Sequence, residues 1–469
     1  MSCKIETWWQ NTFRQSLLLG GTLSALDSVK EKLKPSTGKV GSLLQKLAFL
    51  IVLALFLAIG MPQFANDKMG LALITLISVF LWVLGYLLGG EEKRELSHID
   101  LLVLSLMGIN IICAFSSHYL MASLKGLAKV IVYIGSYFLF TAVLQASPKR
   151  RLIVLFTLLL NGLALAFYGF YQYKIGVAPL ATWEDPSVEG GGGTRIFATM
   201  GNPNLLAGFF TPLVPISLGL SLYFIDLKKY IPAAASILLC GALVLAIVFT
   251  GCRGAYIALG ACLMMFGLCV SVWAWKYLPA VRKYLPVMFL AIIVALALVV
   301  WKVPQVQERI GSMFSGRDHS SNSYRMNVWI ASLHMFAENW WLGIGVGNEA
   351  FRLAYGLYMV SGFDALGTYC VPLEIAVENG IAGVLIFGLL VGLVLLKAHH
   401  LFWDKEQNLG AWRFVVLGLA GAVFALMVHG MVDTVFYRPQ VHFIFWLCVS
   451  LIALPWNTYK EGNIKINAV

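Results

Sequence analysis

Apolar segments of about twenty residues without charged side chains recur along this sequence, and they constrain its fold more than any other feature. A helix needs about 20 such residues to cross about 30 Å of hydrocarbon. Because the hydrocarbon holds no water, the backbone must satisfy its own hydrogen bonds there, as a helix does. The chain of 469 residues is 59% hydrophobic and 12% charged, about half the charged fraction of soluble proteins. The sequence therefore predicts an all-α polytopic membrane protein.

We expect about twelve transmembrane helices. Their expected positions are 47–63, 69–89, 99–116, 122–145, 152–172, 204–225, 231–250, 254–275, 285–303, 371–397, 411–433 and 440–455. The chain then divides into a cytoplasmic segment (1–46), helices one to nine (47–303), a large periplasmic loop (304–370), three final helices (371–455) and a cytoplasmic tail (456–469). Segment 27–46 is expected to lead into the first helix with little fixed structure.

The basic residues predict the orientation. With both termini in the cytoplasm, the expected cytoplasmic segments hold 22 of the 34 lysines and arginines, as the positive-inside rule requires. We therefore expect a multi-pass protein of the cytoplasmic (inner) membrane, in contact with membrane lipids. The same bias explains the net charge of +11 without a nucleic-acid partner. The eight cysteines form no CxxC pair, so we expect no metal site and no cofactor.

Two expected outer segments, about 173–203 and 303–370, are too long to be simple turns, and loops of this length usually have structure or function of their own. Within the second, residues 323–337 place apolar side chains at helical spacing: Met326, Trp329, Ile330, Leu333 and Phe336. We expect an amphipathic helix lying on the outer membrane interface.

Seven arginines fall in the expected outer segments or spans: Arg195, Arg253, Arg309, Arg317, Arg325, Arg352 and Arg438. Arginine suits multidentate contact with phosphate, so this cluster fits a lipid-linked pyrophosphate. The alternative is that these arginines anchor the interface or pair with acids such as Glu308, Asp318 and Glu349. Both interpretations remain open at this point.

Two of these arginines occupy unusual positions. Arg253 lies in the TGCRG turn between two apolar spans, where a charge is costly unless it faces water or a partner. Arg325 heads the amphipathic helix, where main-chain amides already favour an anion. Segment 343–348 (GIGVGN) is glycine-rich, but no strand precedes it, which favours a tight turn over a dinucleotide site.

Acids and a histidine recur at helical spacing near the expected outer ends of two spans. Glu374 and Glu378 are four residues apart, as are His429 and Asp433. Ionisable groups within a membrane are candidates for function, and a carboxylate or an imidazole can deprotonate a sugar hydroxyl. Pairing with the arginines is the structural alternative.

Five segments occur together in an order that is familiar from one superfamily: 194–208 (TRIFATMGNPNLLAG), the TGCRG turn, 323–348 (SYRMNVWIASLHMFAENWWLGIGVGN), 373–382 (LEIAVENGIA) and 429–439 (HGMVDTVFYRP). They resemble the O-antigen ligase and polymerase superfamily over about residues 45–455. The segments ATWEDPSVE, SSNSYRMNVW and YCVPLEIAVENG look most similar to its cyanobacterial IctB branch, which is associated with inorganic carbon transport.

The resemblance implies a glycosyltransferase C-like fold and metal-independent transfer of a polyprenyl-diphosphate-linked glycan to a hydroxyl acceptor. It further implies that Arg253 and Arg325 hold the diphosphate, and we expect Arg195, Asn202, Asn204 and Arg438 to support them. The ligases carry a histidine in an HN-x-x-L pattern, where this chain has Tyr369. A tyrosine, with a pKa of about 10, is a poor base, so Glu374 or His429 could replace that histidine.

Two classes of function therefore follow from the sequence. One is glycan transfer from a lipid diphosphate. The other is transport or accumulation of bicarbonate, in which the same arginines bind a smaller anion. The sequence shows no internal repeat and no paired broken helices of the kind found in many transporters, which counts against transport. The absent family histidine counts against transfer, and an anion-binding scaffold without turnover is a third alternative. We favour glycan transfer.

Overall fold

The computed structural model describes residues 19–64, 68–92, 94, 96–177, 195–284, 287, 294, 301–302, 307, 311, 320–403 and 409–456. Within these ranges the chain forms helices and no strands. In order they are α2 (Leu19–Ala58), η1 (Pro62–Phe64), α3 (Lys68–Leu87), α4 (His98–Ser116), α5 (Leu120–Gln145), α6 (Pro148–Ile175), α7 (Pro203–Asp226), α8 (Tyr230–Thr250), α9 (Arg253–Tyr277), η3 (Pro279–Tyr284), α12 (Ser320–Glu338), α13 (Asn348–Tyr355), α14 (Val371–Trp403), α15 (Trp412–Gly430), η5 (Val435–Tyr437) and α16 (Pro439–Ala453).

Ten of the described helices are long and apolar enough to cross a membrane, which confirms the prediction of an all-α multi-pass membrane protein. They correspond to ten of the twelve expected spans. The expected span at 440–455 is α16, which has 15 residues and is shorter than the others. The expected span at 285–303 lies largely outside the described residues.

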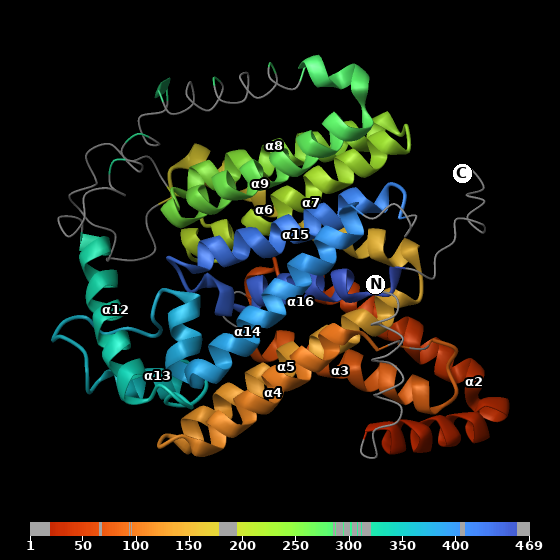
Figure 1. Ribbon diagram of the computed structural model, residues 1–469, viewed down its shortest axis with the longest axis horizontal. Helices are drawn as coiled ribbons and strands as arrows, with labels where there is room; N and C mark the ends of the chain where they lie inside the picture. The colour runs from red at the N-terminus through yellow and green to blue at the C-terminus, as the bar shows by residue number, and fades with distance from the viewer. Residues whose placement is uncertain are drawn as a thin grey trace.

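The short helix α16 lies at the centre of the bundle. It packs against α5, α7, α14 and α15 (Figure 1), and every one of its residues from Pro439 to Ala453 is buried. Because protein surrounds it, α16 does not have to match the thickness of the lipid. The helices α7 and α15 pack closely against each other and complete this central layer.

The segment that leads into the first span is helical, so the expectation of little fixed structure for 27–46 was wrong. Its residues continue α2 and pack along α3. An added Cβ on Gly41 would lie 2.6 Å from the Gly85 carbonyl oxygen, so the two backbones are in close contact. The Thr37 hydroxyl donates to the Leu88 carbonyl at 2.9 Å. The neighbouring helix thus orders a segment whose own sequence is too polar to suggest a span.

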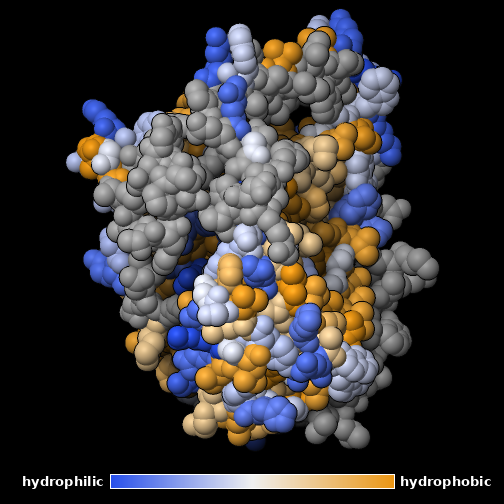
Figure 2. All heavy atoms as spheres, turned by 90° about the vertical axis from the view of Figure 1, so that its left-hand side faces the viewer, coloured by the Kyte–Doolittle hydropathy of each residue, from blue (hydrophilic) through white to orange (hydrophobic). Residues whose placement is uncertain are grey.

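The helix α12 confirms the expected helix at 323–337, and it crosses the direction of α8 and α9 (Figure 1). Its buried side is formed by Val328, Ala331 and Met335, whereas Ile330 and Leu333 are 45% and 53% exposed. We refer to the end of the bundle that carries α12 and α13 as the α12–α13 face. Figure 2 shows hydrophilic and hydrophobic side chains interspersed on it.

Candidate functional site

A cavity of about 930 Å³ lies beneath the α12–α13 face. Residues of α4, α5, α7, α12, α13, α14, η5 and α16 line it, so it collects parts of the chain that are far apart in sequence. Its charged lining residues are the bases Lys129, Arg325, Arg352 and Arg438 and the acids Asp364, Glu374, Glu378 and Asp433. The volume is typical of sites for ligands larger than a small ion.

Asp433 connects several of the predicted residues on one wall of the cavity. Its Oδ2 lies 3.8 Å from Arg325 Nη2 and accepts a hydrogen bond from Asn204 Nδ2 at 3.0 Å. Arg195 Nη2 in turn donates to Asn204 Oδ1 at 2.9 Å, and Arg195 Nε donates to the Thr250 carbonyl at 2.8 Å. A continuous polar chain therefore runs from the TGCRG turn to α12.

The sequence NPN positions this wall at the beginning of α7. Asn202 is the N-cap, and its Oδ1 accepts from the backbone N–H groups of Asn204 at 2.8 Å and Leu205 at 3.3 Å. Pro203 follows at the first helical position, where its missing N–H has no cost. Both asparagines line the cavity as a result.

Arg438 is the cation of this cavity that is least engaged by carboxylates. Arg325 pairs with Asp433 and Arg352 with Asp364, both at 3.8 Å. In the part of the chain that the structure describes, no ion pair joins Arg438 to a carboxylate. Arg438 caps the N-terminus of α16, is exposed and lines the cavity. It can therefore meet an anionic ligand without first breaking an ion pair.

The opposite wall carries two buried carboxyl groups one turn apart on α14. Glu374, which is 4% exposed, accepts from the Thr368 backbone N–H at 3.3 Å. Glu378, also 4% exposed, accepts a hydrogen bond from the Gly347 backbone N–H. Both line the cavity, as the four-residue spacing predicts for one helix face.

A lysine completes this wall. Lys129 of α5 interacts with the charge of Glu378, and its Nζ donates to Asn348 Oδ1 at 2.9 Å. Sequence analysis did not single out Lys129, although a lysine inside a predicted span was a usable signal. The hydrogen bond to Asn348 joins α5 to the beginning of α13.

The glycine-rich loop (343–348) is a turn that packs on α14, as the sequence favoured. At Gly380, where φ is 64°, α14 kinks, and the Ile381 N–H bonds to the Trp340 carbonyl instead of continuing the helix. The carbonyls of Val377 and Glu378 accept from the backbone of Ile344 at 2.9 Å and Gly345 at 3.2 Å. The loop therefore satisfies groups that the kink frees, as a buried backbone requires.

Tyr369, at the position where the ligases have histidine, also lines the cavity. Its backbone has a φ of 55°, which non-glycine residues seldom adopt and which often occurs at functional sites. Its ring contacts the ring of Tyr324 edge-on at 5.6 Å. Burial raises the pKa of the Tyr369 hydroxyl above its usual value, so this group keeps its proton at neutral pH.

Most of the predicted site residues meet in this cavity. Its lining includes Asn202, Asn204, Arg325, Tyr369, Glu374 and Arg438 but not Arg195, Arg253 or His429. Arg195 reaches the wall through Asn204. Arg253 is the first residue of α9, and His429 is fully buried, with Nε2 3.6 Å from Cys252 Sγ. The roles assigned to Arg253 and His429 remain predictions.

Two further predicted arginines, Arg309 and Arg317, lie outside the described residues, as do Glu308 and Asp318. Glu349, the third acid suggested as a partner for the arginines, instead pairs with Lys125 at 3.1 Å. Among the described residues, no group of three or more histidines, cysteines, aspartates or glutamates could hold a metal ion.

The helices and the cavity define a multi-pass helical membrane protein with a charged site beneath one face. Residues 236–388 match the model of the family described as O-Antigen ligase. The matched segment is about a third of the chain, from within α8 to within α14, and contains Arg253, Arg325, Tyr369 and Glu374. This match supports the resemblance to the O-antigen ligase superfamily. The curated proteins include no match to the chain.

Proposed function

We propose that the protein transfers a glycan from a polyprenyl-diphosphate-linked donor to a hydroxyl acceptor within this cavity. The observation that carries the proposal is the meeting of Arg325, Arg438 and Glu374 around one large cavity in a membrane protein. A volume of about 930 Å³ far exceeds the need of bicarbonate and suits the head of a lipid-linked sugar. Glycan transfer is therefore favoured over the carbon-transport alternative suggested by the IctB resemblance.

The donor diphosphate is placed beside Arg438 and Arg325. Guanidinium groups form strong, charge-assisted hydrogen bonds with phosphate oxygens. Arg438 is available without disruption, whereas Arg325 would exchange a long contact with Asp433 for the phosphate. The side-chain amides of Asn202 and Asn204 lie on the same wall and can donate to the remaining oxygens.

Glu374 is the proposed base for the acceptor. The acceptor hydroxyl oxygen attacks the anomeric carbon of the donor sugar, and the bond between that carbon and the diphosphate oxygen breaks. The diphosphate leaves with the bonding electron pair beside the arginines, while the hydroxyl proton passes to the Glu374 carboxylate. Tyr369 retains its own proton and donates a hydrogen bond rather than accepting the proton.

This reaction requires the α12–α13 face to lie on the periplasmic side of the inner membrane. The positive-inside distribution of the sequence supports that orientation, with both termini in the cytoplasm. The polyprenyl tail of the donor would remain in the bilayer while its diphosphate enters the cavity.

Loss of Arg438 should weaken binding of the donor head group. We expect Arg438→Ala to reduce the affinity of nanodisc-embedded protein for a polyprenyl diphosphate by about 10- to 100-fold, since a hydrogen bond to a charged group contributes about 1.5–3 kcal/mol. Arg325→Ala should show a loss at least as large, because the Asp433 carboxylate then faces the diphosphate without its contact to a guanidinium group. Titration followed by native mass spectrometry measures both affinities.

Lys149→Ala is the matched control, because Lys149 is exposed at the N-terminus of α6 and does not line the cavity. The affinity of the Lys149→Ala variant for the polyprenyl diphosphate should equal that of the unaltered protein. Unchanged binding in both arginine variants would remove the proposal.

A further inference from the structure

The cavity extends deep into the bundle between α5 and α16. Its lining includes Tyr133 and Ile134 on α5 and His442 and Trp446 on α16. Ile134 is already fourteen residues beyond the start of α5 at Leu120, a distance of about 21 Å at about 1.5 Å per residue. The depth of the cavity raises the question of what separates it from the opposite face.

Two pairs of rings lie between α5 and α16, one below the other. The rings of Tyr133 and His442 are 4.2 Å apart, and those of Tyr137 and Trp446 are 5.7 Å apart. On each helix the two rings are four residues apart, so they share one face. Trp446 lines the cavity whereas Tyr137 does not. The second pair therefore marks the inner limit of the cavity.

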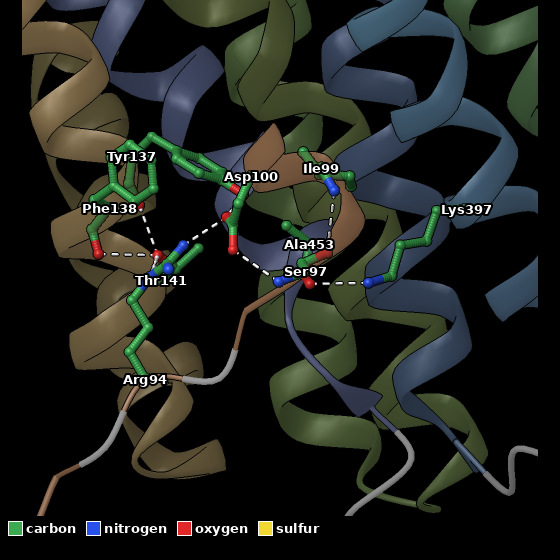
Figure 3. A network of polar contacts seen from close by, with 9 residues as sticks. All are labelled: Arg94, Ser97, Ile99, Asp100, Tyr137, Phe138, Thr141, Lys397 and Ala453. Carbon is green, nitrogen blue, oxygen red and sulfur yellow. Dashed lines mark hydrogen bonds and ion pairs between the residues drawn. The ribbon is translucent and has the colours of Figure 1, made fainter. Parts of the chain in front are cut away.

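A polar network begins directly below the second pair. Figure 3 shows Tyr137 and Arg94 converging on Asp100. The Tyr137 hydroxyl donates to Asp100 Oδ1 at 2.6 Å, and Arg94 Nη2 lies 2.5 Å from the same oxygen. Arg94 Nε also donates to Thr141 Oγ1 at 2.9 Å. Charged and hydroxyl groups thus extend from the face opposite to α12–α13 up to the Tyr137–Trp446 pair.

Along α5, only a short stretch of helix therefore lies between the cavity and this polar network. Ile134 lines the cavity and Thr141 belongs to the polar network. They are seven positions apart, or about 10 Å at about 1.5 Å per residue, and the Tyr137 ring lies between them. An undisturbed bilayer offers about 30 Å of hydrocarbon. The side chains that fill this short length must therefore form the barrier to ions.

We propose that Tyr137 and Trp446 form a permeability seal that separates the aqueous cavity from the polar network on the opposite side of the membrane. Both side chains are at most 2% exposed, and closely packed rings exclude the water that protons and small anions need to pass. The Asp100 carboxylate holds the Tyr137 ring in place through its hydroxyl. The seal would let the protein keep a deep cavity open to one face without letting protons or small ions leak across the membrane.

Removing one ring tests the seal directly. The assay uses liposomes that contain the full-length protein and a trapped pH-sensitive dye. With the unaltered protein, protons should enter these liposomes no faster than they enter protein-free liposomes. Trp446→Ala should accelerate proton entry about tenfold or more, which corresponds to a barrier lower by about 1.4 kcal/mol. Trp446→Phe retains a ring and should remain tight.

Trp412→Ala is the matched control, since Trp412 packs between Tyr223 and Trp456 and lies outside the cavity lining. Elution volume and melting temperature establish that each variant is folded. If Trp446→Ala does not fold, Tyr137→Ala is compared with Tyr137→Phe in the same way. A folded ring-deletion variant that stays tight would overturn the seal, as would rapid proton or bicarbonate entry through the unaltered protein.

Discussion

At the scale of single residues, the proposed reaction gives different roles to two neighbouring groups, Tyr369 and Glu374. Both line the cavity. The pKa of Tyr369 is raised by burial, so the hydroxyl is protonated at any pH near neutrality. Glu374 is held by the backbone N–H of Thr368 and faces the same space. In the proposed reaction, a hydrogen-bond donor and a nearby carboxyl group thus take the place of the ligase imidazole.

This division of roles predicts opposite effects of two conservative substitutions. Glu374→Gln should lower the rate of glycan transfer by about 100-fold or more, because a general base contributes about 10²–10⁴-fold. Tyr369→Phe should keep most of the activity, and its pH–rate profile should follow that of the unaltered protein between about pH 6 and pH 9. A transfer assay with a polyprenyl-diphosphate sugar measures both. A larger loss in Tyr369→Phe than in Glu374→Gln would reverse the assignment.

Sequence reasoning selected several residues that line the cavity, but it did not predict how they are arranged. It selected Arg325, Arg438 and Glu374, because a charge within or beside an apolar span needs a reason. The position of Arg253 outside the cavity lining could not be foreseen, since a turn between two spans does not reveal which way its side chain lies. Lys129 was overlooked because its partner, Asn348, is 219 positions away in the sequence.

At the scale of elements, the glycine-rich loop (343–348) holds α14, the helix that carries Glu374 and Glu378, against α5. The loop lies between α14 and α5, with Val346 N–H donating to Ser123 Oγ at 2.7 Å. Gly126 of α5 makes this approach possible, since a Cβ there would lie 2.1 Å from the Val346 carbonyl oxygen. Gly135, on the same helix, would meet nothing within 4 Å.

These two glycines allow a paired test of the contact. We expect Gly126→Ala to lower the free energy of unfolding by about 1–3 kcal/mol, as overpacking does. Gly135→Ala should be neutral or stabilising by up to about 1 kcal/mol, because alanine is the better helix former. Thermal unfolding in nanodiscs measures both. Equal effects of the two substitutions would show that the loop does not rest against α5 as described.

The helices themselves were largely predictable, and their exceptions have physical causes. Hydrophobicity is a local property, so ten described spans were found from the sequence. The structure of 27–46 was missed because its polar residues are ordered by contacts with α3 rather than by lipid. The kink at Gly380 was missed because a single glycine in an apolar run does not show that another loop will satisfy the freed carbonyls.

At the scale of the whole molecule, one arrangement accounts for both proposals. The central helix α16 carries Arg438 at one end of the cavity and Trp446 at its inner limit. Its burial among α5, α7, α14 and α15 holds Arg438, the proposed diphosphate ligand, and Trp446, one ring of the proposed seal, in a single helix. The class of fold followed from the length of the apolar segments together with the composition. The cavity did not, because it forms only when residues from α4 to α16 come together.

The most direct test is a structure of the protein in a lipid nanodisc with a polyprenyl-diphosphate-linked sugar bound. We expect the diphosphate in the cavity within hydrogen-bonding distance of Arg438 and Arg325, and the sugar directed toward Glu374. A lipid diphosphate bound outside this cavity, or a cavity that holds only a small anion under the same conditions, would contradict the account.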